Sequence, residues 1–223
     1  MERRTLLAAG GGALLALGGG FVIAPRGSDT PVSLLPGAAN AQETTGELPE
    51  ILEMVQGDPD AAVEVIEYAS FTCPHCASFH ANQYKALKAN YIDTGKIRFV
   101  YREVFFDRPG LWASMIARCP DDADFFFNVS NLLYEQQRSW LAGSDPGTIV
   151  EALRTLAKTA GLDDATLDAC LADAPKAESL FTWYQENAER DAVTSTPSFL
   201  IDGAKHGNMS YDDFAAILDA KLS

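Results

Sequence analysis

The feature that most constrains the fold of this 223-residue chain is a pair of cysteines between a predicted strand and a predicted helix. Residues 62–68 form a short apolar run rich in β-branched side chains, which is typical of a buried strand. Cys73 and Cys76 follow, and residues 76–91 contain no Pro or Gly and space their large side chains as a helix does. A second strand is predicted over residues 97–101. Strand, helix and strand in this order predict a parallel βαβ unit.

The chemistry expected of Cys73-Pro74-His75-Cys76 follows from this position. A thiol at a helix N-terminus lies beside unpaired N–H groups and the positive end of the macrodipole, which stabilise the thiolate and lower its pKa. We expect Cys73 to be this nucleophile and Cys76, one turn further in, to be the buried resolving thiol. His75 supplies a positive or hydrogen-bonding partner, and Pro74 fixes one dihedral angle of the loop. A stabilised thiolate makes the corresponding disulfide a strong oxidant.

Two other uses of a Cys-x-x-Cys pair are weaker alternatives. Half of a zinc site needs a second close pair, whereas Cys119 and Cys170 are 51 positions apart and the chain has 3 histidines. A purely structural disulfide would close a loop too small to stabilise the fold much. We therefore predict a redox-active pair that uses no metal ion and no cofactor.

Glu67 lies six positions before Cys73, inside the predicted strand. If that strand is at the edge of the sheet, the carboxylate faces water. If it lies beneath the start of the helix, the carboxylate is semi-buried, its pKa is raised, and it can accept the proton of Cys76 during exchange. The sequence leaves both alternatives open, and the second makes Glu67 a candidate catalytic residue.

The charge of the chain limits its partners. The formal net charge is −14, and the chain has no basic run, so nucleic-acid binding is excluded because phosphate neutralisation needs clustered Lys and Arg. Acidic pairs such as Asp121-Asp122 and Asp163-Asp164 are expected to be solvated faces and helix starts.

The first 41 residues are predicted to lie outside the folded domain. A basic start precedes an uncharged apolar run over residues 6–24, and a small-x-small triplet ends at Ala41. This pattern predicts a secretory signal peptide cleaved after Ala41, with an uncleaved membrane anchor as the alternative. Two adjacent arginines leave the general and twin-arginine export routes both open. We predict a periplasmic protein, membrane-anchored if the signal is retained, with a polar lead over residues 42–60 and one domain over residues 61–223.

The pattern changes to helices between about residues 111 and 191. The helical segments there are separated by Pro and Gly, which end helices. A strand over residues 199–201, a turn at Asp202-Gly203 and an amphipathic helix over residues 211–222 follow. The run after the turn is short and polar, which predicts an irregular hairpin. The predicted fold class is α/β with an all-helical insertion.

The segment around the cysteine pair resembles a known active site. Residues 67–76 are similar to the active-site segment of DsbA-type periplasmic disulfide oxidoreductases, which are members of the thioredoxin-fold superfamily. The likeness extends to residues 57–59 and 194–199. The resemblance implies a thioredoxin fold with a helical insertion between its βαβ half and its C-terminal ββα half. It also implies that Pro197 is a cis-proline facing the cysteine pair and that Thr196 offers backbone groups to an extended substrate peptide.

Two cysteines remain once the resemblance assigns Cys73 and Cys76 to the active pair. In an oxidising compartment we expect Cys119 and Cys170 to form a structural disulfide within the insertion. Two separately buried thiols are the alternative.

The resemblance implies a thiol:disulfide oxidoreductase that introduces disulfides into exported proteins through Cys73 and Cys76. The expected partners are reduced or unfolded exported proteins and a membrane-bound protein that reoxidises the pair, and we expect the chain to be a monomer. A disulfide isomerase and a periplasmic thiol reductase or carrier are alternatives on the same fold, because Thr before the cis-proline also occurs in isomerases. A non-catalytic module that holds unfolded chains is disfavoured because it needs no thiols.

Overall fold

The computed structural model describes residues 47–223. The predicted signal peptide or anchor of residues 1–41 lies outside the described residues, as does the start of the polar lead. Among the helices of residues 47–223, none combines the length and apolarity that crossing a bilayer requires.

A five-stranded mixed sheet forms the centre of the described domain, in the order β1-β3-β2-β4-β5. Its strands are β1 (Met54–Gly57), β2 (Val63–Ala69), β3 (Ile97–Glu103), β4 (Ser198–Ile201) and β5 (Ala204–Gly207). The strands β2 and β3 are parallel, whereas the other neighbours are antiparallel. The predicted βαβ unit is therefore confirmed, and its first strand is the middle strand of the sheet.

The two outer strands differ from the sequence-based expectations. β1 lies inside the polar lead of residues 42–60, where no strand was expected, and Met54 pairs with Tyr101 of β3. The expectation of an irregular last hairpin is wrong, because β5 pairs with β4 from Ser198↔Gly207 to Ile201↔Ala204. Backbone pairing needs no apolar side chains at a solvated edge. The turn residues Asp202 and Gly203 both have positive φ, as a tight hairpin turn requires.

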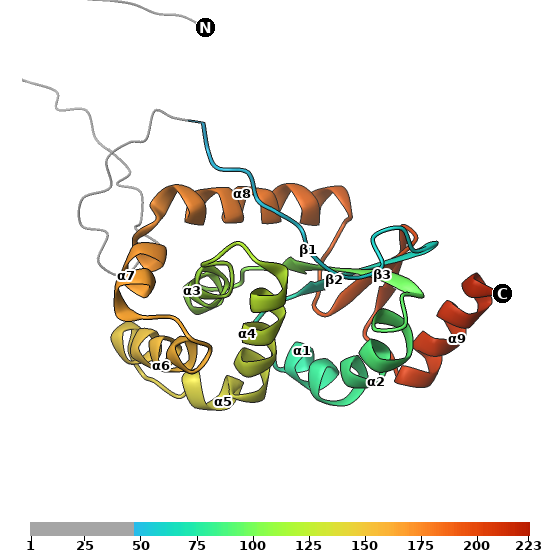
Figure 1. Cartoon of the computed structure of the whole chain (residues 1–223), viewed down its shortest axis with the longest axis horizontal. Helices are drawn as coiled ribbons and strands as arrows, with labels where there is room; N and C mark the ends of the chain where they lie inside the picture. Colours follow the sequence, from blue (N-terminus) through green and yellow to red (C-terminus); the bar gives the residue numbers. More distant parts are fainter. Residues whose placement is uncertain (1–46) are drawn as a thin grey trace, which may run out of the picture. The chain divides into compact units, whose positions relative to one another are not determined.

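The helix that follows the cysteine pair is continuous in the chain but alternates between two forms. It consists of α1 (Pro74–Phe79), the π-helical η1 (His80–Tyr84), α2 (Lys85–Leu87) and the π-helical η2 (Lys88–Ile92). The C-terminal helix α9 (Tyr211–Leu222) contacts both α2 and β2. These helices cover one face of the sheet, and α8 covers the other (Figure 1).

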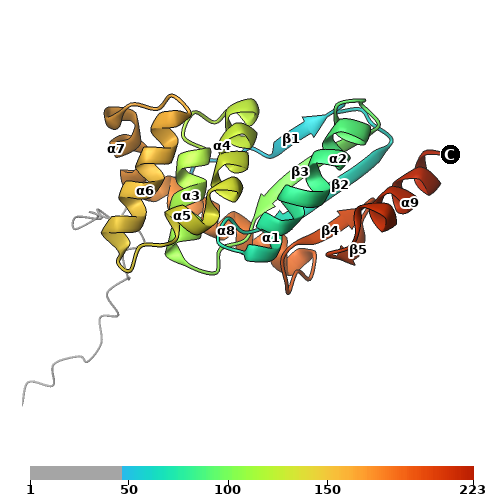
Figure 2. The ribbon, with the colours of Figure 1, turned by 90° about the horizontal axis from the view of Figure 1, so that it is seen from below.

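The helical insertion contains α3 (Arg108–Ala117), α4 (Ala123–Glu135), α5 (Gln137–Trp140), α6 (Pro146–Thr159), α7 (Asp164–Ala172) and α8 (Ala174–Arg190). α3 packs against α4, α6, α7 and α8, and its residues from Gly110 to Ala117 are all buried, as expected of a helix that is apolar on every side. Figure 2 shows α3–α7 gathered to one side of the sheet.

Aspartates begin five of these helices. The side-chain carboxylates of Asp107, Asp122, Asp145, Asp163 and Asp173 accept hydrogen bonds from backbone N–H groups in the first turns of α3, α4, α6, α7 and α8. Such a cap stabilises a helix by about 1 kcal/mol. Much of the acidity in the insertion therefore belongs to helix starts, as expected for two of the acidic pairs.

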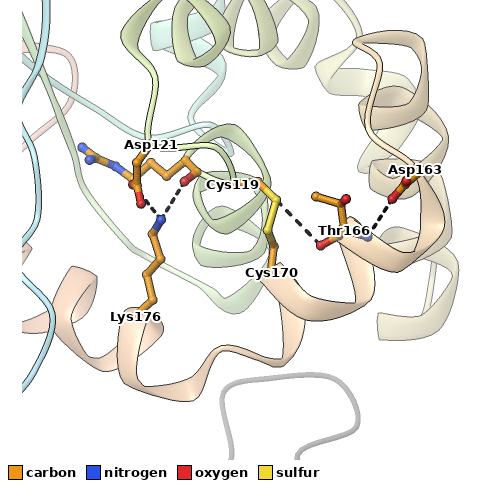
Figure 3. Close-up of a disulfide and its surroundings, with 7 residues drawn as sticks. Cys119, Asp121, Asp163, Thr166, Cys170 and Lys176 are labelled. Atoms are coloured by element: carbon orange, nitrogen blue, oxygen red, sulfur yellow. Dashed lines mark hydrogen bonds and ion pairs between the residues drawn. A yellow bond between two sulfur atoms is a disulfide. The ribbon is translucent and has the colours of Figure 1, made fainter.

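A disulfide joins Cys119, which follows α3, to Cys170 of α7 (Figure 3). Nearby, the Lys176 ammonium donates to the carbonyl oxygen of Arg118 and forms an ion pair with Asp121. The disulfide and these contacts tie the end of α3 to both α7 and the start of α8. The alternative of two separate thiols is not what the structure contains.

Candidate active site

Cys73 is the N-cap residue of α1. Its backbone is extended, and Pro74 occupies the first turn, where the missing N–H costs nothing. The backbone N–H of Cys76 donates to Cys73 Sγ at 3.4 Å. After β2 the chain turns, and this turn places the sulfur of Cys73 at the N-terminus of α1, next to the backbone N–H groups of its first turn.

The surroundings of Cys73 favour its thiolate. The hydrogen bond from the Cys76 thiol lowers the pKa of Cys73 to about 5, with further help from the Thr196 side chain and the N–H groups of Cys76 and His75. Burial opposes this shift but does not outweigh it. At neutral pH the sulfur is a thiolate, so it is both a nucleophile and a good leaving group.

Cys76 behaves in the opposite way. It has no exposed surface, whereas Cys73 is 8% exposed. Burial raises the pKa of Cys76 far above that of a free thiol, and the Cys73 side chain and the Glu67 charge raise it further. Two thiols one turn apart therefore differ strongly: one ionises readily and the other keeps its proton.

The chain before β4 lies beside the sulfur of Cys73. The peptide bond between Thr196 and Pro197 is cis, and Cys73 Sγ lies 3.6 Å from the Thr196 carbonyl oxygen. The structure thus brings together two segments that are 123 positions apart in the chain. Pro74 and His75, by contrast, are exposed on the outer side of the helix start.

Glu67 lies in the interior of the protein. It belongs to the central strand β2, where it pairs with Phe199 of β4 and Tyr101 of β3. Alternate strand residues share a face, and its neighbours Val65 and Ala69 pack in the same core cluster as Cys76. Glu67 is fully buried, so the alternative of an edge-strand carboxylate in water is wrong.

Two residues that the sequence did not single out complete the site. His80 Nε2 lies 3.2 and 3.1 Å from the two carboxylate oxygens of Glu67. Gln137 of α5 is buried, and its amide donates to the carbonyl oxygens of Phe71 and Cys73 at 2.8 and 2.9 Å. The helical insertion therefore contributes directly to the loop that carries Cys73. No local sequence pattern marks Gln137.

The described residues offer no metal centre: within residues 47–223, no group of three or more His, Cys, Asp or Glu side chains could hold a metal ion. The arrangement is one of a reactive thiolate, a buried thiol and a carboxylate in the core behind them. Such a set can exchange disulfides and move a proton.

This combination of fold and paired cysteines defines a thioredoxin-fold protein with a dithiol centre. The chain belongs to the thioredoxin family, whose model matches residues 50–220. Its helical insertion and sheet agree with the DsbA-type branch. Wolbachia pipientis alpha-DsbA1 superposes with a TM-score of 0.72 at 27% identity, over 78% of this chain and 93% of that one. The predicted fold and the family resemblance are thus confirmed.

Two other relatives bear on function. A Rickettsia bellii protein named as a protein-disulfide oxidoreductase is 32% identical over 170 residues, which cover 76% of this chain and 64% of the relative. The chain therefore spans less than two thirds of that relative's length. A structure described as a protein-disulfide isomerase from Novosphingobium aromaticivorans has a TM-score of 0.67 at 26% identity, over 77% of this chain and 97% of that one.

Proposed function

We propose that the chain is a thiol:disulfide oxidoreductase that introduces disulfides into exported proteins through Cys73 and Cys76. The observation that supports this most is the contrast between the two thiols. A dithiol whose first thiol is ionised at neutral pH is favoured over its disulfide, and the disulfide is correspondingly oxidising.

Oxidation of a substrate takes two exchanges. A substrate thiolate attacks Cys73 Sγ, the bond between Cys73 and Cys76 breaks, and its electron pair goes to Cys76 Sγ, which takes up a proton. A second substrate thiolate attacks the substrate sulfur of the mixed disulfide, and the electron pair leaves on Cys73 Sγ as thiolate. The substrate loses two electrons, and the protein gains two electrons and one proton.

Each remaining site residue has a proposed part in this exchange. Glu67 exchanges the proton of Cys76, since its carboxylate acts electrostatically on that thiol. Thr196 and Pro197 hold an extended substrate strand beside Cys73 by backbone pairing. Pro74 and His75 shape the exposed turn, and the His75 N–H favours the thiolate. The disulfide of Cys119 and Cys170 is proposed to be structural.

The proposed setting is the periplasm. We expect the chain to be exported as a monomer by the signal predicted in residues 1–41, to act on reduced or unfolded exported proteins, and to be reoxidised by a membrane-bound partner. The part of the polar lead before β1 would then connect the signal to the domain, because β1 already belongs to the sheet. Labelling of the intact protein in fractionated cells tests this location.

A disulfide isomerase is the second candidate, favoured by the Novosphingobium neighbour's description and by Thr196 before the cis-proline. A thiol reductase or carrier is the third. The equilibrium of Cys73 and Cys76 against glutathione buffers separates the oxidase from the carrier, because an oxidase has a strongly oxidising pair and a carrier a strongly reducing one.

Activity on two substrates completes the test. An oxidase forms disulfides in a reduced, unfolded protein, whereas an isomerase rearranges a scrambled one. A Cys73→Ser variant should lose both activities, and oxidation that persists in this variant would refute the proposed nucleophile.

A further inference from the structure

His80 is a buried titratable residue that the proposed exchange does not yet use. It is only 4% exposed and is the first residue of η1. One ring nitrogen, Nε2, faces both carboxylate oxygens of Glu67. The other, Nδ1, is buried and makes no hydrogen bond to any residue of the described range 47–223. A buried polar atom without a partner is unusual and calls for an explanation.

The second nitrogen belongs to a ring that borders a pocket. A pocket of about 50 Å³ lies between α4 and the helix that begins with α1 and η1. These two helices contact each other, and α1 and α4 lie side by side in Figure 1. His80 and Tyr134 line the pocket, together with Ala81, which is exposed. Lys85 and Glu135 also line it, and their solvent-exposed side chains form an ion pair. A pocket of this size with polar groups such as Lys85 and Glu135 in its lining can admit water, so the His80 ring lies between Glu67 and solvent.

The proposed exchange needs such a connection. Each reduction of the disulfide puts one electron pair on Cys73, which stays a thiolate, and one on Cys76, which binds a proton because burial raises its pKa. Cys76 is fully buried. One proton must therefore enter the core for every disulfide reduced and leave it for every disulfide formed.

We infer that His80 carries this proton between Glu67 and the pocket. Nε2 exchanges it with the Glu67 carboxyl group, Nδ1 exchanges it with water in the pocket, and the ring returns to its starting protonation over a full redox cycle. The inference rests on the proposed function and extends it, because it gives the buried carboxylate a route to solvent that avoids the substrate side of Cys73. His80 is in these terms a positioning residue that acts through Glu67.

The other groups around His80 suit this role. The titratable side chains that face it or its pocket are Glu67 from β2, Tyr84 from η1, Lys85 from α2, Tyr101 from β3, and Tyr134 and Glu135 from α4, and Cys76 of α1 lies one helical turn before it. Burial raises the pKa of all three tyrosines, so they remain neutral phenols. Lys85 and Glu135 are exposed and pair with each other.

The decisive variant is His80→Gln. Its amide can still donate a hydrogen bond to Glu67, but it cannot take a proton on one atom and release it from another. We expect closure of the Cys73–Cys76 disulfide by oxidised glutathione, and its reopening by reduced glutathione, to slow by the same factor, roughly tenfold or more. The equilibrium against glutathione should not move. Rapid mixing, acid quench and alkylation measure both rates.

A wild-type rate in His80→Gln would overturn the inference, as would a rate change in one direction matched by a shift in the equilibrium. His206→Gln, which removes a histidine from the edge strand β5, is the matched control and should exchange as the wild type does.

A second variant tests the pocket without touching the buried pair. Ala81→Leu should fill the pocket and slow both directions, whereas Ala81→Ser at the same position should not. If Ala81→Leu exchanges at the wild-type rate, the pocket is not the route. If the wild type itself shows no exchange that depends on Cys73, the proposed function fails. If the wild type shows exchange that depends on Cys73 but the His80→Gln and Ala81→Leu variants exchange as fast as the wild type, the proton route fails and the proposed function stands.

Discussion

The thiolate of Cys73 should make the stability of the reduced protein depend on pH in a way that the disulfide form does not share. The pKa of Cys73 is about 5 in the folded protein, against about 8.5 in an unfolded chain. A thiol whose pKa is lower in the folded protein than in the unfolded chain stabilises the folded state. This contribution is complete above the pKa of the unfolded chain, and it is lost as the pH falls through the pKa of the folded protein. Each pH unit between the two is worth about 1.36 kcal/mol. The two units from pH 5 to pH 7 therefore amount to ~2.7 kcal/mol.

Urea unfolding of the two redox forms at about pH 4 and about pH 7 measures this contribution. The free energy of unfolding of the reduced form, minus that of the disulfide form, should rise by ~2.7 kcal/mol between these values. Groups that titrate alike in both forms cancel in the difference. Cys76 adds nothing in this range, because burial raises its pKa and it stays a thiol in the folded and the unfolded chain.

Two checks protect the measurement. Mass mapping of alkylated cysteines must show that Cys119 and Cys170 remain bonded in both samples. The Cys73→Ser variant lacks the ionising thiol and cannot form the disulfide, so it takes the place of the reduced wild type in the comparison. Its free energy of unfolding, minus that of the wild-type disulfide form, should show no such rise. A difference that stays constant from pH 4 to pH 7 in the wild type would refute the reasoning, because it would mean that the Cys73 thiol is not stabilised as thiolate.

Three further changes test the structure around the site, each by urea unfolding. Gln137→Met should lower the free energy of unfolding by ~1–3 kcal/mol, because the buried Phe71 carbonyl group loses its side-chain donor, whereas that of Cys73 keeps the Ala77 N–H; no measurable loss would contradict this. Replacing both Cys119 and Cys170 with Ala should cost up to ~4 kcal/mol for their 51-residue separation, and no loss would show that the bond does not restrain the unfolded chain. Arg118→Met should cost ~3–5 kcal/mol by leaving the buried Glu103 carboxylate unpaired, and adding Glu103→Leu should recover much of that loss.

The order of elements around the cysteine pair could be predicted because its signals are local. A β-branched run, a Cys-x-x-Cys and a helical spacing occur within thirty residues, and the structure places β2, α1 and β3 accordingly. β1 could not be predicted in the same way. It has four residues, and its identity as a strand depends on pairing with β3, more than forty positions along the chain.

The burial of Glu67 and the position of His80 depend on information that the sequence does not display. Whether β2 is an edge or a central strand is decided by β4, which lies some 130 positions later. His80 stands one helical turn after Cys76, at the end of the regular helix α1 and before the π-helical turns shift the phase of later side chains. A periodicity of 3.6 residues therefore places His80 on the same face as Cys76, but it cannot show that Glu67 lies opposite that face.

The helical insertion is part of the redox centre rather than a separate cover over it. α5 supplies Gln137, which holds the carbonyl groups of Phe71 and Cys73, and α4 supplies Tyr134, whose ring stacks on His80 at 4.2 Å. The first contact fixes the loop on which the thiolate forms, and the second encloses the route proposed for the proton. The thioredoxin core provides the two sulfurs and the carboxylate, but the support of the Cys73 loop and the surroundings of His80 are built jointly with the insertion. Changes in α4 and α5 should therefore alter exchange rates even where they leave the cysteines and the sheet untouched.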